Sequence, residues 1–209
     1  MQQIFETSRL LLRELEKEDF GDLCDILQDE ACMYAYEHAF SREEALEWFH
    51  RQRERYRQYG TGLWAVIRKE DGAFLGQCGI TLQHVGKPET HTPCRRGGLP
   101  AAVCRLPAGR PAGRPRLSPG PEEEVEIGYL LKRRFWHKGY ATEAASGCRD
   151  YAFQALNLPR VTSIIREDNL ASRLVAERVG MRPDYRFIKR YYGMDMPHIV
   201  YALEISPGV

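Results

Sequence analysis

The chain has 209 residues, of which 43% are hydrophobic, and its formal net charge is +1. This length and composition suit one domain over 1–209 that buries roughly 70% of its unfolded surface. The near-neutral charge excludes a general electrostatic drive toward nucleic acid or an anionic membrane, so an argument from charge has to be local.

The first ten residues lack the basic and apolar segments of an export signal. No stretch approaches the ~18 continuous apolar residues that a membrane span needs. We therefore expect a cytoplasmic protein without a membrane partner. The six cysteines form no C-x-x-C pair and fit no zinc spacing, which favours reduced thiols and no metal site, although an even number could pair in a secreted chain.

In chain order, the first predicted elements are a strand over 7–13 and a short amphipathic helix over 17–28. Ser41, with Glu44 three positions later, forms a capping box that predicts a second helix ending at Gly60. Two adjacent antiparallel strands are then expected at 63–67 and 74–82, joined by a hairpin turn at 70–72.

Residues 86–121 break this regularity, because they are dense in Pro, Gly and Arg and show almost no apolar periodicity. The segment holds six arginines and no acidic residue between Thr90 and Pro121, so it could bind nucleic acid or an acidic partner. It lacks the interleaved aromatic residues that stack on bases. A solvated irregular insert, or a sequence that arose by reading-frame error, is the favoured interpretation.

Residues 125–145 run from an apolar strand through a short basic loop into a helix. Backbone N–H groups at a helix N-terminus lack intrahelical partners and lie at the positive end of the helix dipole, so this junction can bind phosphate. Gly139 allows close backbone approach, Ala141 adds little bulk, and Lys138 and His137 contribute positive charge. The loop matches no Walker pattern and no dinucleotide G-x-G-x-x-G.

The helix after this loop is predicted to run from about Gly139 to Leu156, and the helix dipole explains Glu143 in its first turn. A strand at 161–165 and a helix that ends at Val179-Gly180 come next. The last two predicted strands lie at 185–192 and 198–204.

Three motifs stand in order along the chain. They are the opening strand Thr7-Ser8-Arg9-Leu10-Leu11-Leu12-Arg13, the Gly-Tyr-Ala-Thr-Glu-Ala segment at 139–144, and a helix start with Asn169 and Ser172. In this order they resemble the GNAT superfamily of acyl-CoA-dependent N-acetyltransferases, and within it the branch of ribosomal-protein N-terminal acetyltransferases. The resemblance covers about Thr7 to Leu203 with one large gap.

The resemblance implies an α+β fold with about four helices and a twisted, mostly antiparallel sheet. Its fourth and fifth strands, here 125–131 and 161–165, would splay apart to admit acetyl-CoA, the implied co-substrate. The backbone of 129–131 would bind pantetheine and donate to the thioester carbonyl, and the loop 136–141 would hold the pyrophosphate. The implied cofactor-binding residues are Tyr129, Leu130, Leu131, Trp136, His137, Lys138, Gly139, Tyr140, Ala141, Thr142, Asn169 and Ser172.

Acyl transfer to an amine needs a base, because a free amine is partly or largely protonated at pH 7. Some members of the family carry this base on the fourth strand, which makes Glu126 the first candidate and Glu124 the second. The alternative for Glu126 is an ordinary solvent-facing strand residue. For Asn169 and Ser172 the alternative to coenzyme binding is helix capping.

The chain departs from the family at three positions. Ala176 stands where many relatives carry a tyrosine, Ser163 stands at a site where some carry a base, and Trp136 replaces a Gln or Arg of the loop. Without that charge, Lys138, His137 and the backbone amides would take more of the phosphate binding. Residues that could replace the missing tyrosine are Tyr191, Tyr192 and His198.

The sequence therefore predicts an acetyl-CoA-dependent N-acetyltransferase that acts on a primary amine, in a peptide or protein N-terminus or a small molecule. Two alternatives stay open: a catalytically weak acyl-CoA-binding module, and an Arg-rich nucleic-acid adaptor on the same scaffold. The acceptor is not encoded in these motifs, nucleic acid is the disfavoured partner, and a homodimer is open.

Overall fold

The computed structural model describes residues 2–36, 38–86, 92–94, 117, 119–191 and 193–205. Most of the Pro/Gly/Arg-rich segment at about 86–121 therefore lies outside the described residues. The chain forms two compact units, the first from residues 1–81 and 127–148 and the second from 82–126 and 149–209. The single domain expected from chain length stays a prediction.

The first unit contains an open sheet in the order β1-β2-β3-β4-β6. Neighbouring strands from β1 to β4 are antiparallel, with Leu12 opposite Val66 and Ala65 opposite Gln77. Strands β4 and β6 run on into the second unit. The bounds are β1 Gln3–Glu6, β2 Leu10–Arg13, β3 Leu63–Arg68, β4 Phe74–His84 and β6 Glu123–Leu131.

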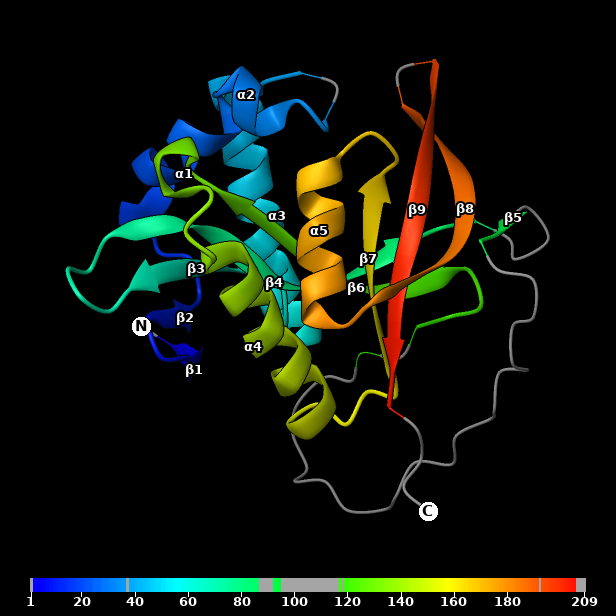
Figure 1. The fold of residues 1–209 in the computed structure, drawn as a ribbon. Coiled ribbons are helices and arrows are strands. Elements are labelled where there is room, and N and C mark those ends of the chain that lie inside the picture. The colour runs from blue at the N-terminus through cyan, green and yellow to red at the C-terminus, as the bar shows by residue number, and fades with distance from the viewer. Residues whose placement is uncertain are drawn as a thin grey trace. The chain divides into compact units, whose positions relative to one another are not determined.

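The helical elements of the first unit are η1 Lys17–Asp19, α1 Phe20–Leu27, α2 Glu30–Met33, α3 Arg42–Tyr59, η3 Arg133–Phe135 and the start of α4 Tyr140–Gln154. Figure 1 shows β1 and β2 near the N-terminus. Apolar side chains of the strands and of α1 form the core, among them Leu10, Leu12, Leu23, Ile26, Trp64 and Leu75. Among the described residues there are five α-helices against about four expected, and the additional one is the single turn α2.

The capping box predicted for α3 is confirmed. The Ser41 hydroxyl accepts a hydrogen bond from the Glu44 amide at 3.2 Å, and the Ser41 amide donates to the Glu44 carboxylate at 2.8 Å. The helix ends where expected, because Gly60 adopts a left-handed φ of 69° that closes the last turn.

Gly76 of β4 allows close approach of β6. A Cβ atom at this position would lie 2.2 Å from the Leu130 carbonyl oxygen and 2.7 Å from the Leu131 Cα atom. Backbone cannot yield like a flexible side chain, so we expect Gly76→Ala to lower the free energy of unfolding by about 1–3 kcal/mol in urea titrations. Gly21→Ala in α1 is the control, because its Cβ would meet open space, and it should raise stability by up to about 1 kcal/mol. Equal losses in both variants would contradict this account.

The second unit contains a sheet in the order β6-β7-β9-β8-β5. Strand β7 is parallel to β6 and antiparallel to β9, and β8 is antiparallel to both β9 and β5. In Figure 1, β7, β9 and β8 are neighbouring strands and α5 packs against β7. The bounds are β5 Thr92–Pro93, β7 Arg160–Arg166, α5 Leu170–Val179, β8 Arg182–Tyr191 and β9 Met194–Glu204.

Strands β6 and β7 are the expected fourth and fifth strands of the family. Within the described residues their register is the single pair Glu126 and Thr162. Next to that pair, the Thr162 hydroxyl donates to the Val125 carbonyl oxygen at 3.1 Å. None of the described helices combines the length and the apolar character that a membrane span requires.

Candidate active site

The basic loop between η3 and α4 lies in the first unit and has an unusual backbone. His137 and Gly139 both have positive φ, of 59° and 79°, on either side of Lys138. The indole Nε1 of Trp136 donates to the Leu131 carbonyl oxygen at 2.8 Å, which ties the loop to the end of β6. Residues 137–139 are exposed, whereas Tyr140 is buried.

The start of α4 leaves backbone amides available for an anion. The first backbone hydrogen bond of this helix runs from the Glu143 amide to the Gly139 carbonyl oxygen, at 3.0 Å. The amides of Tyr140, Ala141 and Thr142 therefore precede the first intrahelical bond, at the positive end of the helix dipole. A helix start of this geometry can bind a diphosphate, and that role stays a prediction.

Positive side chains gather beside this loop. The Lys138 ammonium lies 5.7 Å from the centroid of the Phe135 ring, and the Arg134 guanidinium lies 4.9 Å from it. Arg68 approaches the same ring at 5.3 Å, although its guanidinium is paired with Asp71. Local charge therefore favours an anion here even though the whole chain is nearly neutral.

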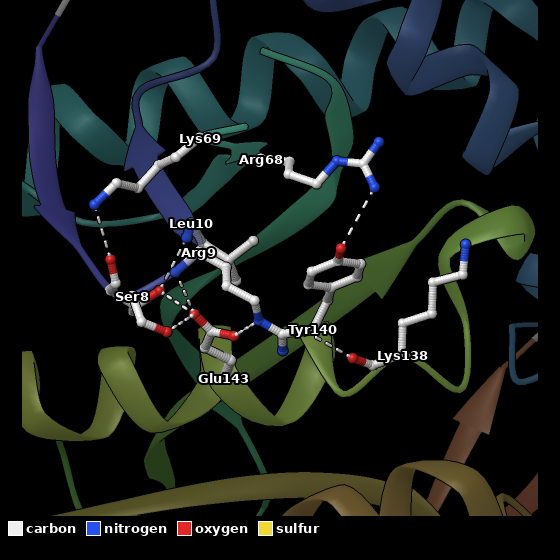
Figure 2. Close-up of polar contacts among 9 residues, drawn as sticks. Ser8, Arg9, Leu10, Arg68, Lys69, Lys138, Tyr140 and Glu143 are labelled. Atoms are coloured by element: carbon white, nitrogen blue, oxygen red, sulfur yellow. Dashed lines mark hydrogen bonds and ion pairs between the residues drawn. The ribbon is translucent and has the colours of Figure 1, made fainter. Parts of the chain in front are cut away.

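Glu143 makes more contacts than a favourable helix dipole would require. Its carboxylate accepts hydrogen bonds from the Thr7 hydroxyl at 2.6 Å, the Ser8 hydroxyl at 3.1 Å, and the amide and Nε of Arg9 at 2.9 and 2.6 Å (Figure 2). Burial alone would raise the pKa of this carboxyl, but the hydrogen bonds from Thr7 and Arg9 outweigh it and lower the pKa. The opening motif of the chain thus binds the first turn of α4.

Arg9 also contacts the loop directly. Its Nη1 donates to the Lys138 carbonyl oxygen at 3.2 Å, and its guanidinium lies 4.5 Å from the centroid of the Tyr140 ring. The Tyr140 hydroxyl accepts from Arg68 at 3.4 Å on the other side (Figure 2). Sequence reasoning missed the ion pair of Arg9 and Glu143, which we call the Arg9–Glu143 clamp, because these two residues are 134 positions apart.

The end of β6 holds the residues expected to bind pantetheine. Tyr129 and Leu130 are half-buried, and Leu131 is buried. The Leu131 carbonyl oxygen accepts from Trp136 and is 3.7 Å from the Cys32 sulfur. These three residues lie in the first unit with the loop.

Asn169 and Ser172 lie in the second unit, at the start of α5. The Asn169 side chain caps this helix, because its Oδ1 accepts from the Ser172 amide at 3.0 Å. The capping alternative is therefore observed. A role in coenzyme binding stays a prediction for both residues.

The two candidate bases also belong to the second unit. Glu126 is half-buried and pairs in register with Thr162. Glu124 accepts hydrogen bonds from Arg160 at 3.3 Å and from the Tyr185 hydroxyl at 3.0 Å. Because Arg160 also binds Asp184 and Glu204, Glu124 is one member of a charge network.

The remaining residues discussed in the sequence analysis include Ala176, Tyr192 and His198. Ala176 is buried in α5, and Tyr192 lies outside the described residues. His198 packs against Phe187, and its burial lowers its pKa below the usual range. In the described part of the chain, no group of three or more His, Cys, Asp or Glu side chains could hold a metal ion.

The sequence profile of the acetyltransferase (GNAT) domain matches residues 9–182. The chain belongs to the GNAT acetyltransferase family. The mixed α/β fold with its mostly antiparallel sheet is the GNAT fold, as predicted. Family membership makes this GNAT acetyltransferase an acetyl-CoA-dependent acyltransferase.

Alignments with known proteins extend over most of this GNAT acetyltransferase. The uncharacterized protein YkkB of Bacillus subtilis is 31% identical over 84% of the chain and 83% of its own length. A crystal structure of an acetyltransferase from Agrobacterium tumefaciens is 26% identical with a TM-score of 0.68, covering 98% of this chain and 95% of that one. RimL, a ribosomal alpha-N-protein acetyltransferase solved with coenzyme A, shares the fold at 16% identity and a TM-score of 0.66, with 98% of each chain covered.

Proposed function

We propose that this GNAT acetyltransferase transfers an acetyl group from acetyl-CoA to a primary amine, in a peptide or protein N-terminus or a small molecule, by direct attack in a ternary complex. The observation that carries the proposal is the start of α4. Its open amides, the left-handed Gly139 and the adjacent cations suit a diphosphate. Bound acetyl-CoA would supply an acyl group activated as a thioester.

Coenzyme binding is assigned to backbone more than to side chains. The amides from Lys138 to Thr142 would bind the diphosphate, with charge from Lys138 and His137. The backbone of Tyr129–Leu131 would bind the pantetheine arm and donate to the acyl carbonyl oxygen as negative charge develops there. Asn169 and Ser172 would contribute from the start of α5.

Glu126 is the proposed base. A neutral amine is the nucleophile, and a carboxylate can remove its proton directly or through a water molecule. Glu126 is the first candidate because it adjoins the run 127–131 that is assigned to the pantetheine arm, and Glu124, which binds Arg160, is the second. Ala176 cannot donate a proton, but the solution pKa of a thiol, about 8.5, makes a dedicated acid dispensable.

A peptide N-terminus is the first acceptor class to test. The Thr-x-Arg-Leu-x-Leu-Arg opening strand resembles that of the ribosomal-protein N-terminal acetyltransferases, and RimL shares the fold. Small amines are the second class, because a GNAT fold alone does not fix the acceptor. A cytoplasmic location and a homodimer stay predictions.

The test is an acetylation assay with a panel of amines. Peptides that begin with Ser, Ala or Met, polyamines and small primary amines are each incubated with acetyl-CoA, and free thiol and product mass are measured. We expect thiol release with an acetylated product for at least one acceptor. Tight coenzyme A binding without turnover across the panel would instead support the binding module.

A further inference from the structure

We propose that Arg9 is a positioning residue for the loop 136–141, and that it sets coenzyme A affinity by fixing the direction of the Gly139 amide. The proposal rests on the proposed function, because it assigns a role in binding the same diphosphate. It concerns residues of the first unit only.

The geometry of one peptide group carries the argument. The Lys138 carbonyl oxygen accepts a hydrogen bond from Arg9 Nη1 at 3.2 Å. In a planar trans peptide the C=O and the following N–H point in opposite directions, and no cis peptide occurs in the described residues. Arg9 therefore turns the Gly139 N–H away from its own guanidinium, so that this amide can donate to an anion.

This peptide group would otherwise be free to turn. It joins Lys138 to Gly139 and follows His137, whose φ of 59° is sparsely populated for a residue with a Cβ atom, whereas glycine tolerates the φ of 79° at Gly139. Such a conformation persists only where its surroundings determine it. Arg9 supplies that constraint, and its guanidinium also lies over the Tyr140 ring at 4.5 Å.

Glu143 fixes Arg9 in turn. The Glu143 carboxylate binds Arg9 Nε at 2.6 Å, while the Glu143 amide donates to the Gly139 carbonyl oxygen at 3.0 Å. The Glu143 side chain therefore holds Arg9 (Figure 2), and the Glu143 backbone holds Gly139 of the same loop. The Glu143 side chain is 16% exposed and the Arg9 side chain 48%, so the ion pair is shielded from solvent on the glutamate side.

The experiment measures coenzyme A binding by calorimetry for the wild type, Arg9→Gln, Arg9→Lys and Glu143→Gln. We expect Kd to rise about tenfold in Arg9→Gln, since a hydrogen bond of a charged group is lost. Arg9→Lys should lose nearly as much, because an ammonium group keeps the charge but not the planar fork that reaches Glu143 and Lys138 together.

A second measurement needs no ligand. Hydrogen exchange of the Glu143 amide, which donates to the Gly139 carbonyl oxygen, should be faster in Arg9→Gln than in the wild type, while exchange in the core strands should be unchanged. The double variant Arg9→Gln/Glu143→Gln should bind coenzyme A no more weakly than Arg9→Gln alone, because the Glu143 carboxylate acts on the loop through Arg9.

Lys69→Gln is the matched control. It removes one positive charge from the same region, where Lys69 Nζ donates to the Thr7 carbonyl oxygen at 3.1 Å and pairs with Glu6. Its Kd should stay within about twofold of the wild type, since screened surface charge contributes little.

Two results would overturn the inference while leaving the proposed function intact. One is wild-type coenzyme A affinity in Arg9→Gln. The other is wild-type affinity in Arg9→Lys, which would mean that Arg9 contributes its charge and not its hydrogen-bond geometry. If the wild type itself binds no coenzyme A, the proposed function fails and the inference fails with it.

Discussion

Gly139→Glu is expected to abolish coenzyme A binding. The backbone at this position has a φ of 79°, which a residue with a Cβ rarely adopts, so the loop would be strained. The new carboxylate would stand beside the amides assigned to the diphosphate. Two like charges about 4 Å apart repel by about 4 kcal/mol at an effective dielectric of about 20, which corresponds to a loss of affinity of roughly a thousandfold. Calorimetry measures the loss, and thermal unfolding checks that the variant is folded.

Gly139→Ala separates the two causes. It has the same backbone strain without the charge, and its Cβ would be 3.5 Å from Arg9 Nη2, an ordinary contact. We expect a partial loss of affinity, smaller than that of the glutamate variant. A folded Gly139→Glu protein that binds coenzyme A like the wild type would remove this loop from the site.

Glu126→Gln is expected to lower kcat by about 10²-fold or more while leaving coenzyme A affinity within about twofold. Glutamine keeps the shape and hydrogen-bonding capacity of the side chain but cannot accept the amine proton. Measurement of kcat, KM and the calorimetric Kd on the same preparations distinguishes a base from a binding residue.

Glu124→Gln is the control for this variant, because it removes the same charge two positions earlier in β6. The Glu124 carboxylate is paired with Arg160 and accepts from Tyr185. Its loss should therefore lower the unfolding temperature, while kcat stays close to that of the wild type. If the Glu126 variant keeps its kcat and the Glu124 variant loses it, the two assignments must be exchanged.

Sequence patterns predicted the elements whose signals are local. The capping box at Ser41 and the left-handed Gly60 define α3 within one residue of the expected bounds. The strand before the basic loop, β6, and the helix after it, α4, were also predicted, because an apolar run, a glycine and a helical pattern follow one another closely in the sequence. Family resemblance added the order of these elements.

Two short elements were not predicted. Strand β1 has four residues, and it exists because Gln3 and Phe5 pair with Arg13 and Leu12 of β2. Helix α2 is one turn capped by Asp29, too short to show a helical period.

The same limit applies to the candidate site. The loop 136–141 was proposed for phosphate binding from local chemistry, but the Arg9–Glu143 clamp joins two motifs that the sequence presents at opposite ends of the first unit. Glu143 has a sufficient local explanation in the helix dipole, which conceals its contacts with Thr7, Ser8 and Arg9. Pairings of this kind require the fold.

The central claim, that the amides at the start of α4 hold the diphosphate of coenzyme A, is tested most directly by a backbone amide NMR titration of the wild type. Coenzyme A should shift the amide resonances of residues 138–142, and pantetheine, which lacks the diphosphate, should leave them in place. Coenzyme A that binds without moving those resonances would contradict the account.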